Sequence, residues 1–569
     1  MADDALTTVT VTLATADRLR DARDWPAAAD AYAAWLADHL ADWGIWVQHG
    51  HCVKEAGDPY AALASYRRAE AGLPGDPDVK VQIGHALKLA GDPAGARAAY
   101  AAALDLDGLN EAAWQEWRSD PRDDPPAPVL ALPGDLHVVF DLSDLLAWFR
   151  GARGPTGIQR VQMDLVGPAL RPGAPAATVT LAVFRAESGT WRALPRPLFR
   201  RLAALSRSGT DTADPAWTEA VDLARAALDA APDLAFAEGA WLVNPGSSWE
   251  MPGYHTAVRA ARARHRLRYA AVLHDCGPVV VPEHVPPATA ARFARWLSVL
   301  SAEADLILTV SEATARDLAR LRREALPGLP EAPVATLGLD AAPSPPPPAP
   351  PHPAAEALAG TPYVLLVGTV ESRKDHLFVL HAWLALLRRR GGAVPRLVLA
   401  GRAGFGGGPA LALLNRAPDL AAGVTRLDDV PDATLAALYR GALFTLYNSA
   451  HEGWGLPVTE ALAAGKAVVA PAHTGLLESG AGLACHFAPG SEPEFLAIVE
   501  RLLDDAAFRA EVEARIAAVF RPRPWRDLSD SILLRLPDVP PRAPVSPPRL
   551  GLTHRLAALD GYRPGPAMF

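Results

Sequence analysis

Apolar positions follow two different patterns along this chain of 569 residues. Up to about residue 118, small residues and tyrosines recur in units typical of a helix, a short turn and a second helix. Beyond residue 134, short apolar runs alternate with amphipathic stretches such as 288–303, which is typical of βαβ units around a parallel sheet. The sequence therefore predicts an all-α part followed by a larger α/β part.

Strands are predicted in two blocks. The first block has strands over 136–141, 178–184, 240–243, 269–274, 305–311 and 334–337, and the second over 363–368, 396–401, 424–427, 443–448 and 467–470. A Pro-rich stretch between the blocks is expected to be extended and semi-rigid. Two such blocks predict two Rossmann-like domains facing a cleft, with ligands beyond the carboxyl ends of the strands.

The first part contains an internal repeat. Its period is 34 residues, marked by Tyr32, Tyr66 and Tyr100. Gly57 and Gly91 are expected to end one helix of a pair, and Asp58 and Asp92, each followed by proline, to cap the next. Over residues 14–118 this pattern resembles tetratricopeptide repeats, whose stacked helix pairs bury a common face. Such a module binds a peptide or partner protein, or serves only for packing or dimerisation, and the sequence leaves both open.

The predicted fold class is α/β, with two Rossmann-like domains facing a cleft, preceded by an all-α helical-repeat domain. The predicted segments, in chain order, are helical repeats over 1–119, a linker over 120–134, a Rossmann-like domain over 135–340, a Pro-rich linker over 341–356, a second Rossmann-like domain over 357–536 and a Pro-rich tail over 537–569.

Composition narrows the class of protein. A hydrophobic content of 50% with 21% charged residues is typical of a soluble globular protein. The net charge of −9 argues against sequence-independent binding of nucleic acid, which needs a basic surface. The three cysteines lie far apart, without the spacing of a zinc site or a disulfide framework. We see no signal peptide and no apolar run of membrane-spanning length, so the expected location is cytoplasmic, with at most peripheral contact at the inner face of the membrane.

Residues 451–465, HEGWGLPVTEALAAG, are the most informative segment. They follow an apolar strand and lead into a helix. Gly453 and Gly455 allow a tight turn and the close approach of a ligand, and Leu456 opens the helix with a proline after it. The free N–H groups of a helix N-terminus form an anion site. Glu452 and Glu460 flank this turn.

The spacing of these two glutamates resembles the EX7E signature of glycosyltransferase family 4, the retaining transferases of the GT-B fold. Other segments are similar to the same family: VGTVESRKDH at 367–376, LVLAGRAGFGG at 397–407, LDDVPDATLAALYRGA at 427–442 and the glutamate of TGLLESG, Glu478. The resemblance covers roughly 363–536. It implies that the second Rossmann-like domain binds a sugar-nucleotide donor and that the first binds the acceptor.

The resemblance also implies roles for individual residues. Arg373 and Lys374 would neutralise the donor diphosphate. Glu460 would bind the ribose hydroxyls, and the amides around Gly453, Gly455 and Leu456 would meet the diphosphate or the sugar. Glu452 is expected to contact the donor sugar and orient its anomeric carbon, without acting as a nucleophile. An ordinary solvated ion pair or surface carboxylate is the alternative for these side chains.

The first Rossmann-like domain is less typical of the family. Thr156 and Gly157, in GPTGIQRV, resemble the glycine-containing loop of the acceptor domain and are expected at the donor, with a plain strand-to-helix turn as the alternative. His274 and Asp275 end a strand and resemble the His-Asp pair that several members place at the donor sugar, so we predict a catalytic role. Ser311 is expected to be a helix N-cap.

No cofactor is expected, and the nucleotide-diphosphate sugar is the donor substrate. No metal is expected either, because the two D-x-D matches, Asp76 with Asp78 and Asp105 with Asp107, lie in the repeat part. Members of the family generally work without a metal.

The sequence thus predicts a retaining glycosyltransferase that moves a sugar to a glycan or lipid-linked acceptor in bacterial surface polysaccharide synthesis. One alternative is a protein glycosyltransferase whose repeats bind the polypeptide acceptor. Another is an inactive transferase that acts as a scaffold and binds a protein partner through the repeats. The long insert at 185–239 carries a basic run, expected as a solvated helix, with a membrane-surface helix as the alternative.

Overall fold

The computed structural model describes residues 13–119, 135–176, 178–327, 331–347 and 352–542. The linker predicted over 120–134 and most of the predicted tail, from residue 543 on, lie outside the described residues. The chain forms two compact units. The first contains the described residues up to 119 together with 195–205 and 222–227, and the second contains both α/β domains.

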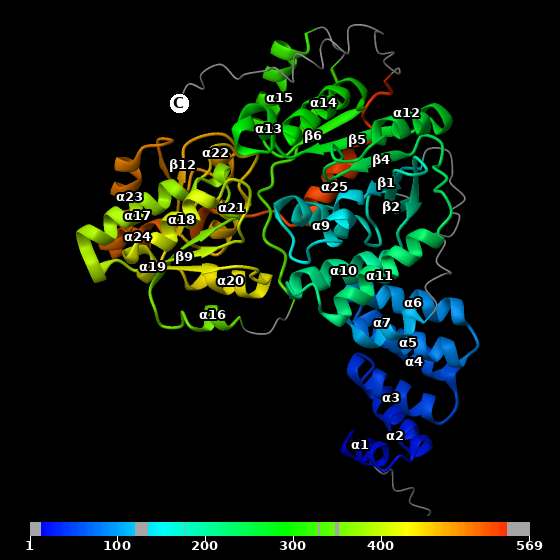
Figure 1. Ribbon diagram of the computed structural model, residues 1–569. Coiled ribbons are helices and arrows are strands. Elements are labelled where there is room, and N and C mark those ends of the chain that lie inside the picture. Colours follow the sequence, from blue (N-terminus) through cyan, green and yellow to red (C-terminus); the bar gives the residue numbers. More distant parts are fainter. Residues whose placement is uncertain (1–12, 120–134, 177, 328–330, 348–351, 543–569) are drawn as a thin grey trace, which may run out of the picture. The chain divides into compact units, whose positions relative to one another are not determined.

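The first unit is all-α. Its described helices up to residue 119 are α1 (Leu13–Asp21), α2 (Trp25–Asp38), α3 (Trp43–Glu55), α4 (Pro59–Gly72), α5 (Pro77–Leu89), α6 (Pro93–Leu106) and α7 (Glu111–Arg118), in blue in Figure 1. The predicted helix ends are confirmed: Gly57 and Gly91 have φ of 98° and 82°. Asp58 accepts from the backbone N–H of Ala61 at 2.9 Å, and Asp92 accepts from that of Gly95 at 2.8 Å.

Repeated glycine–tyrosine contacts explain the 34-residue period. A Cβ on Gly50 would lie 2.5 Å from the ring of Tyr66, and one on Gly84 would lie 2.4 Å from the ring of Tyr100. Both rings are buried. Tyr66 and Tyr100 therefore each pack on the bare backbone of the first helix in their pair, and these two contacts require glycine. The residue at the same position in the first pair, with Tyr32, is Ala16.

Part of the long insert belongs to this helical unit. The insert forms β3 (Thr190–Ala193), α10 (Arg196–Ser208) and α11 (Pro215–Ala230). Within the unit, Arg200 donates to Asp105 at 2.9 Å and Arg201 to Glu111 at 2.8 Å. The basic run of the insert thus meets carboxylates of the repeat region.

The first α/β domain is built on a seven-stranded sheet of order β3-β2-β1-β4-β5-β6-β7. Its further strands are β1 (His137–Asp141), β2 (Thr178–Arg185), β4 (Trp241–Asn244), β5 (Arg268–Leu273), β6 (Leu306–Thr309) and β7 (Val334–Thr336). The pairs are parallel except that β3 runs antiparallel to β2. All six strands predicted in this block are present. The edge strand β3 was missed, because only four residues with one buried side chain carry no clear alternation.

Helices follow most of the strands of this domain. They are α8 (Ser143–Phe149), α9 (Gly157–Ala169), α12 (Tyr254–His265), α13 (Gly277–Val280), η1 (Pro282–His284), α14 (Pro287–Glu303) and α15 (Glu312–Ala325). Ser311 caps α15, as predicted, by accepting from the backbone N–H of Thr314 at 3.0 Å. Strands β4, β5 and β6 are buried almost throughout, as expected of a parallel sheet covered on both faces.

The second α/β domain has a parallel six-stranded sheet of order β10-β9-β8-β11-β12-β13. The strands are β8 (Tyr363–Val367), β9 (Arg396–Ala400), β10 (Val424–Leu427), β11 (Thr445–Leu446), β12 (Val468–Pro471) and β13 (Cys485–Phe487), of which only β13 was not predicted. Its helices are α16 (Pro353–Glu356), η2 (Ser372–Lys374), α17 (His376–Arg390), η3 (Gly391–Ala393), α18 (Gly408–Arg416), α19 (Pro418–Gly423), α20 (Asp432–Gly441), α21 (Leu456–Ala463), α22 (Gly475–Ser479), α23 (Glu492–Asp504) and α24 (Ala506–Val519).

The last described helix, α25 (Trp525–Arg535), returns to the first α/β domain and packs on α9. Arg171, just after α9, is paired with Asp530 of α25 at 2.6 Å. The predicted fold class is confirmed: an all-α helical region precedes two α/β domains with parallel sheets. Among the described residues, no helix is long and apolar enough to cross a membrane.

Candidate active site

A cavity of about 420 Å³ lies between the two α/β domains, at the carboxyl ends of their strands. It is lined by every site residue predicted from the sequence: Thr156, Gly157, His274, Asp275, Arg373, Lys374, Glu452, Gly453, Gly455, Leu456 and Glu460. This is the position at which open parallel sheets bind ligands. The structure thus brings the predicted residues together, while their individual roles stay predictions.

The two predicted cations stand on a sharply turned loop after β8. Gly368, with φ of 152°, leaves the strand, and η2 presents Arg373 and Lys374. Asp375 adopts a left-handed conformation, with φ of 44°, and caps α17 by accepting from the backbone N–H of Phe378 at 3.2 Å. The helix cap thereby fixes the direction in which the two preceding side chains leave the backbone.

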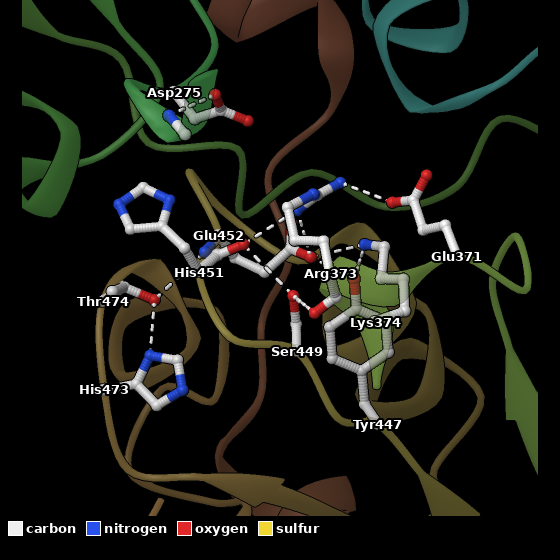
Figure 2. A network of polar contacts seen from close by, with 11 residues as sticks. Asp275, Glu371, Arg373, Lys374, Tyr447, Ser449, His451, Glu452, His473 and Thr474 are labelled. Carbon is white, nitrogen blue, oxygen red and sulfur yellow. Dashed lines mark hydrogen bonds and ion pairs between the residues drawn. The ribbon is translucent and has the colours of Figure 1, made fainter. Parts of the chain in front are cut away.

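Both cations converge on one carboxylate oxygen, as Figure 2 shows. Arg373 donates to Oε1 of Glu452 at 2.7 Å, and the ammonium of Lys374 donates to the same oxygen. The hydroxyl of Tyr447 also donates to this atom, at 3.0 Å. The other guanidinium nitrogen of Arg373 pairs with Glu371 at 3.0 Å. In the free protein these two cations are therefore balanced by two carboxylates.

The pKa of Glu452 reflects this environment. Burial alone would raise it, but the nearby Arg373 and Lys374 outweigh burial and hold the pKa far below its usual range. Burial lowers the pKa of the Lys374 ammonium, and Glu452 opposes that effect. Glu452 is consequently ionised throughout the physiological range, and its charge holds two partly buried cations in place.

The turn after Glu452 brings a helix end into the cavity. Gly455, with φ of 92°, is the N-cap of α21, which leaves the first N–H groups of that helix without a side-chain acceptor from its cap. Gly453 lies so close to the first domain that a Cβ there would lie 1.7 Å from the carbonyl oxygen of His274. Glycine is therefore required at the two positions for different reasons. Residue 455 has a left-handed backbone conformation, and at residue 453 there is no space for a side chain.

Glu460 lies one turn inside α21 and accepts from the hydroxyl of Tyr439 at 2.8 Å. Burial raises the pKa of Glu460, and nearby Arg160 opposes that effect. Arg160 itself makes a two-pronged ion pair with Asp432 at the start of α20, one contact being 2.8 Å. A partly exposed acid with one hydroxyl donor, beside an arginine that is already paired with Asp432, has capacity left for hydrogen bonds from a ligand.

The first α/β domain contributes side chains with well-defined hydrogen bonds. Nε2 of His274 lies 2.9 Å from the carbonyl oxygen of Pro245. Since a carbonyl only accepts, Nε2 carries the proton. Burial lowers the pKa of His274, which keeps the ring neutral and leaves Nδ1 as an acceptor. Asp275 accepts from the backbone N–H of Gly277 at 2.8 Å.

The loop that contains Thr156 lies opposite α21, the helix that contains Glu460. Thr156 is the N-cap of α9, and its hydroxyl donates to Gln159 rather than capping the helix by its side chain. A Cβ on Gly157 would lie 3.8 Å from the side chain of Leu456. The N-termini of α9 and α21 thus meet at the cavity, which makes the space between them favourable for an anion.

The lining or contacting side chains that were not predicted include Arg160, Glu371, Tyr439 and Tyr447. Arg160 follows Gly157 by three positions on α9, so helical spacing could have placed it on the cavity side. The two tyrosines carried no such signal, because a tyrosine at a strand end or in a helix is ordinarily a core residue.

Among the described residues, no group of three or more His, Cys, Asp or Glu side chains is arranged to hold a metal ion. The predicted independence of a metal is not tested by this arrangement and stays a prediction.

Part of the second α/β domain matches a known protein family. Residues 361–505 match the family described as Glycosyl transferases group 1. This matching segment holds Arg373, Lys374, Glu452 and Glu460.

Two curated relatives come from Escherichia coli. The serotype-specific mannosyltransferase WbdA is 30% identical over 198 residues, which are 33% of this chain and 24% of WbdA. The O-antigen chain mannosyltransferase B is 29% identical over 266 residues, 46% of this chain and 68% of that protein. The chain thus spans about a quarter of the length of WbdA. Among solved structures, Anabaena Alr3699/HepE in complex with UDP is 15% identical with a TM-score of 0.45, covering 71% of this chain and 100% of that one.

Proposed function

We propose that this chain is a retaining glycosyltransferase of family 4 that transfers a sugar from a nucleoside-diphosphate sugar to a glycan or lipid-linked acceptor in the synthesis of a bacterial surface polysaccharide. The convergence of Arg373 and Lys374 on Glu452, at the N-terminus of α21 and inside the cavity, carries this proposal. Mannose is the first candidate for the sugar, because both curated relatives are mannosyltransferases.

The diphosphate of the donor would lie beside Arg373 and Lys374. In the free protein both cations are already paired with Glu452, so a diphosphate can exchange for one carboxylate without a large reorganisation. The N–H groups at the start of α21 add a fixed positive potential. This arrangement stabilises the negative charge that develops on a departing diphosphate and needs no metal ion.

The sugar and the ribose would be held on either side of the diphosphate. Glu460, partly exposed and with one hydroxyl donor, is suited to accept from the ribose hydroxyls. Glu452 and the neutral His274 face the sugar side of the cavity, where each can accept a hydrogen bond from a sugar hydroxyl.

Glu452 is a poor nucleophile because two cations and a tyrosine hydroxyl already share its Oε1 atom. We therefore assign it to orienting the sugar. In the retaining reaction proposed here, the acceptor hydroxyl attacks the anomeric carbon from the face that the diphosphate leaves, and its proton passes to an oxygen of that leaving group. The described side chains then act by holding the donor and acceptor and by excluding water.

We further propose that the helices of residues 13–118 are tetratricopeptide repeats that bind a protein partner, and that the protein works in the cytoplasm. The glycine–tyrosine contacts at a 34-residue period support the assignment of the repeats. A protein acceptor held by these repeats is the second candidate for the acceptor.

Binding of nucleotides tests the proposal directly. GDP, UDP, GDP-mannose and UDP-glucose would each be added to the full chain and the melting temperature followed. A ligand at about 100 times its dissociation constant stabilises a protein by roughly 2.7 kcal/mol. We expect one nucleotide family to stabilise the wild type and to fail with Glu460→Ala and Lys374→Ala. Arg416→Ala, on the exposed surface of α18, is the matched control and should respond like the wild type. If none of the four ligands changes the melting temperature, the proposal is wrong.

A further inference from the structure

Helix α15 belongs to the first α/β domain, yet a carboxylate of the second domain completes its N-terminus. The two oxygens of Glu478, on α22, accept from the backbone N–H groups of Glu312 and Ala313, both at 2.8 Å. The next N–H, that of Thr314, is taken by Ser311. An α-helix leaves its first N–H groups without intrahelical partners, and here two of them have an acceptor only because the domains meet.

A second contact joins the same helix to the loop of the glutamate pair. Nε2 of His451 lies 2.8 Å from Oδ2 of Asp317 on α15. His451 is only 3% exposed, and its carbonyl oxygen accepts from Arg373 at 2.8 Å. Figure 2 shows His451 directly before Glu452 in the polar network. One residue therefore ties the loop to α15 by its ring and to the cation pair by its backbone.

The surroundings of the His451 ring favour its charged form. Burial lowers the pKa of His451, but the hydrogen bond to Asp317 and the charges of Asp275, Asp317 and Glu452 outweigh burial and raise it. The cations near this site are Arg320, which pairs with Asp317 at 3.5 Å, and Arg373. The other titratable neighbours are His473 and Asp275, which follows β5. A Cβ on Gly277 would lie 3.7 Å from Nδ1 of His451.

We propose that Glu478, Asp317 and His451 are positioning residues, through which α15 of the first domain holds the Glu452 loop in the geometry that receives the donor sugar. This inference rests on the proposed function and names residues for it that do not line the cavity. It assigns Glu478 to a contact between the domains.

The loop needs such support because its own sequence is permissive. Gly453 and Gly455 follow Glu452, and glycines restrain the backbone least. Glu452 lies between two anchors: His451 on one side, held by Asp317, and Gly475, whose N–H donates to the Glu452 carbonyl at 3.1 Å and which begins the helix of Glu478. Both anchors are connected to α15: His451 contacts Asp317, and Glu478, on the helix that Gly475 begins, caps the N-terminus of α15. A shift of that helix would consequently displace the Glu452 carboxylate from both sides.

Hydrogen exchange measures the order of this loop without requiring any activity. The variants are Glu478→Gln, Asp317→Asn and His451→Gln in the full chain. We expect the amides of residues 449–456 to exchange about tenfold faster in Glu478→Gln and Asp317→Asn, the size expected on losing one charged hydrogen bond. Glu312→Gln, an exposed glutamate on the first turn of α15, is the matched control and should exchange like the wild type. Unchanged exchange in the first two variants would overturn the inference.

Kinetics and pH separate positioning from general stability. With GDP-mannose, or whichever of the four nucleotides above binds, we expect Glu478→Gln to lower kcat about tenfold and to change the nucleotide dissociation constant by less than about twofold. An equal loss in kcat and in nucleotide affinity would indicate a merely structural role.

In the wild type, hydrogen exchange of residues 449–456, corrected for the intrinsic rate, should speed up as pH rises through the raised pKa of His451, because the ion pair with Asp317 is then lost. His451→Gln should remove this dependence, and a dependence that survives contradicts the role of His451. If no nucleotide binds, the proposed function fails, while the exchange data still decide this inference.

Discussion

At the scale of single residues, opposite charges in the site balance one another. Glu452 keeps its charge in a buried place because Arg373 and Lys374 contact it, and those two cations are tolerated there for the same reason. Glu460 lies in a different situation, partly exposed and with one hydroxyl donor. The two glutamates of one motif therefore respond differently to the same substitution.

Replacing Glu452 by Gln should separate donor binding from transfer. The amide keeps the size of the side chain but leaves the two cations with one carboxylate fewer, so the free energy of unfolding should fall by about 1–3 kcal/mol. Binding of the diphosphate should strengthen by roughly threefold, because the cations no longer have Glu452 as a competitor. Transfer should be lost. Titration calorimetry with GDP and UDP, beside a transfer assay, checks both effects, and weaker diphosphate binding in Glu452→Gln would show that the cations do not face that group.

Replacing Glu460 by Gln should stabilise the free protein at neutral pH. Burial raises the pKa of Glu460 in the folded state, so the favourable contribution of the neutral acid is present at low pH and is lost as pH rises through the folded pKa. Glu460→Gln should therefore gain roughly 0.5–2 kcal/mol at pH 8 and lose that advantage toward pH 4. Nucleotide binding should weaken roughly tenfold to a hundredfold. Thermal melts across this pH range test the sign, and an advantage that grows toward acid pH would contradict the argument.

At the scale of elements, the glycines of the repeat helices set how closely the pairs pack. A Cβ at Gly84 would lie 2.4 Å from the ring of Tyr100, and because that ring is buried it cannot move aside without displacing its neighbours. We expect Gly84→Ala to destabilise the helical unit by about 1–3 kcal/mol. Hydrogen exchange of residues 77–106 in the full chain would localise the effect.

The same helical region provides the control. Gly44, in α3, has open space where a Cβ would lie, with nothing within 4 Å, and its φ is not unusual. Gly44→Ala should therefore be neutral or stabilising by about 0.5–1 kcal/mol. If Gly84→Ala and Gly44→Ala behaved alike, close packing would not be the reason for the repeated glycine.

Strands and helix starts could be predicted from the sequence where the local residue pattern is sufficient to determine them. The apolar runs located eleven strands, and the Gly-Asp-Pro turns located the helix starts at Pro59 and Pro93. The strands β3 and β13 were missed because each is short and lies at a sheet edge, so little burial marks it.

The candidate site was partly predictable for a related reason. The signature segment placed Glu452 and Glu460 at a strand-to-helix turn, and the structure has that turn. The partners of these residues could not be predicted. Arg160 lies near Glu460 only because elements far apart in sequence meet. Tyr439, 21 residues before Glu460, and Tyr447, five residues before Glu452, have no local pattern that indicates their contacts. Likewise, nothing in the local sequence of Glu478 indicates that it caps a helix 165 residues earlier.

At the scale of the whole α/β unit, the two domains meet at a few specific points. Arg160 pairs with Asp432, Glu478 caps α15, and α25 returns to pack on α9. All three join segments distant in the sequence. The geometry of the cavity therefore depends on contacts that neither domain makes alone, and Gly453 lies at a further close approach, beside the carbonyl oxygen of His274.

Gly453→Ala tests this dependence. A Cβ at this position would lie 1.7 Å from the carbonyl oxygen of His274 and 3.1 Å from the side chain of Asp275, so the loop and the strand end must separate. We expect transfer to fall at least about a hundredfold, because displacement of about 1 Å at a reacting centre has an effect of that size. The dissociation constant of GDP or UDP should change by less than about fivefold, since Arg373, Lys374 and Glu460 all belong to the second domain.

The control for this variant is Gly392→Ala, an exposed glycine of the same domain with no atom within 4 Å of the added methyl group. It should keep both binding and transfer. Because Gly453 has no positive φ, alanine is not excluded there by its own backbone, and any loss must come from the clash with His274. Full transfer activity in Gly453→Ala would mean that the working enzyme holds its domains further apart than they lie in this structure. Weak nucleotide binding together with lost transfer would mean instead that the first domain contributes directly to the donor site, through residues such as Thr156 and Gly157.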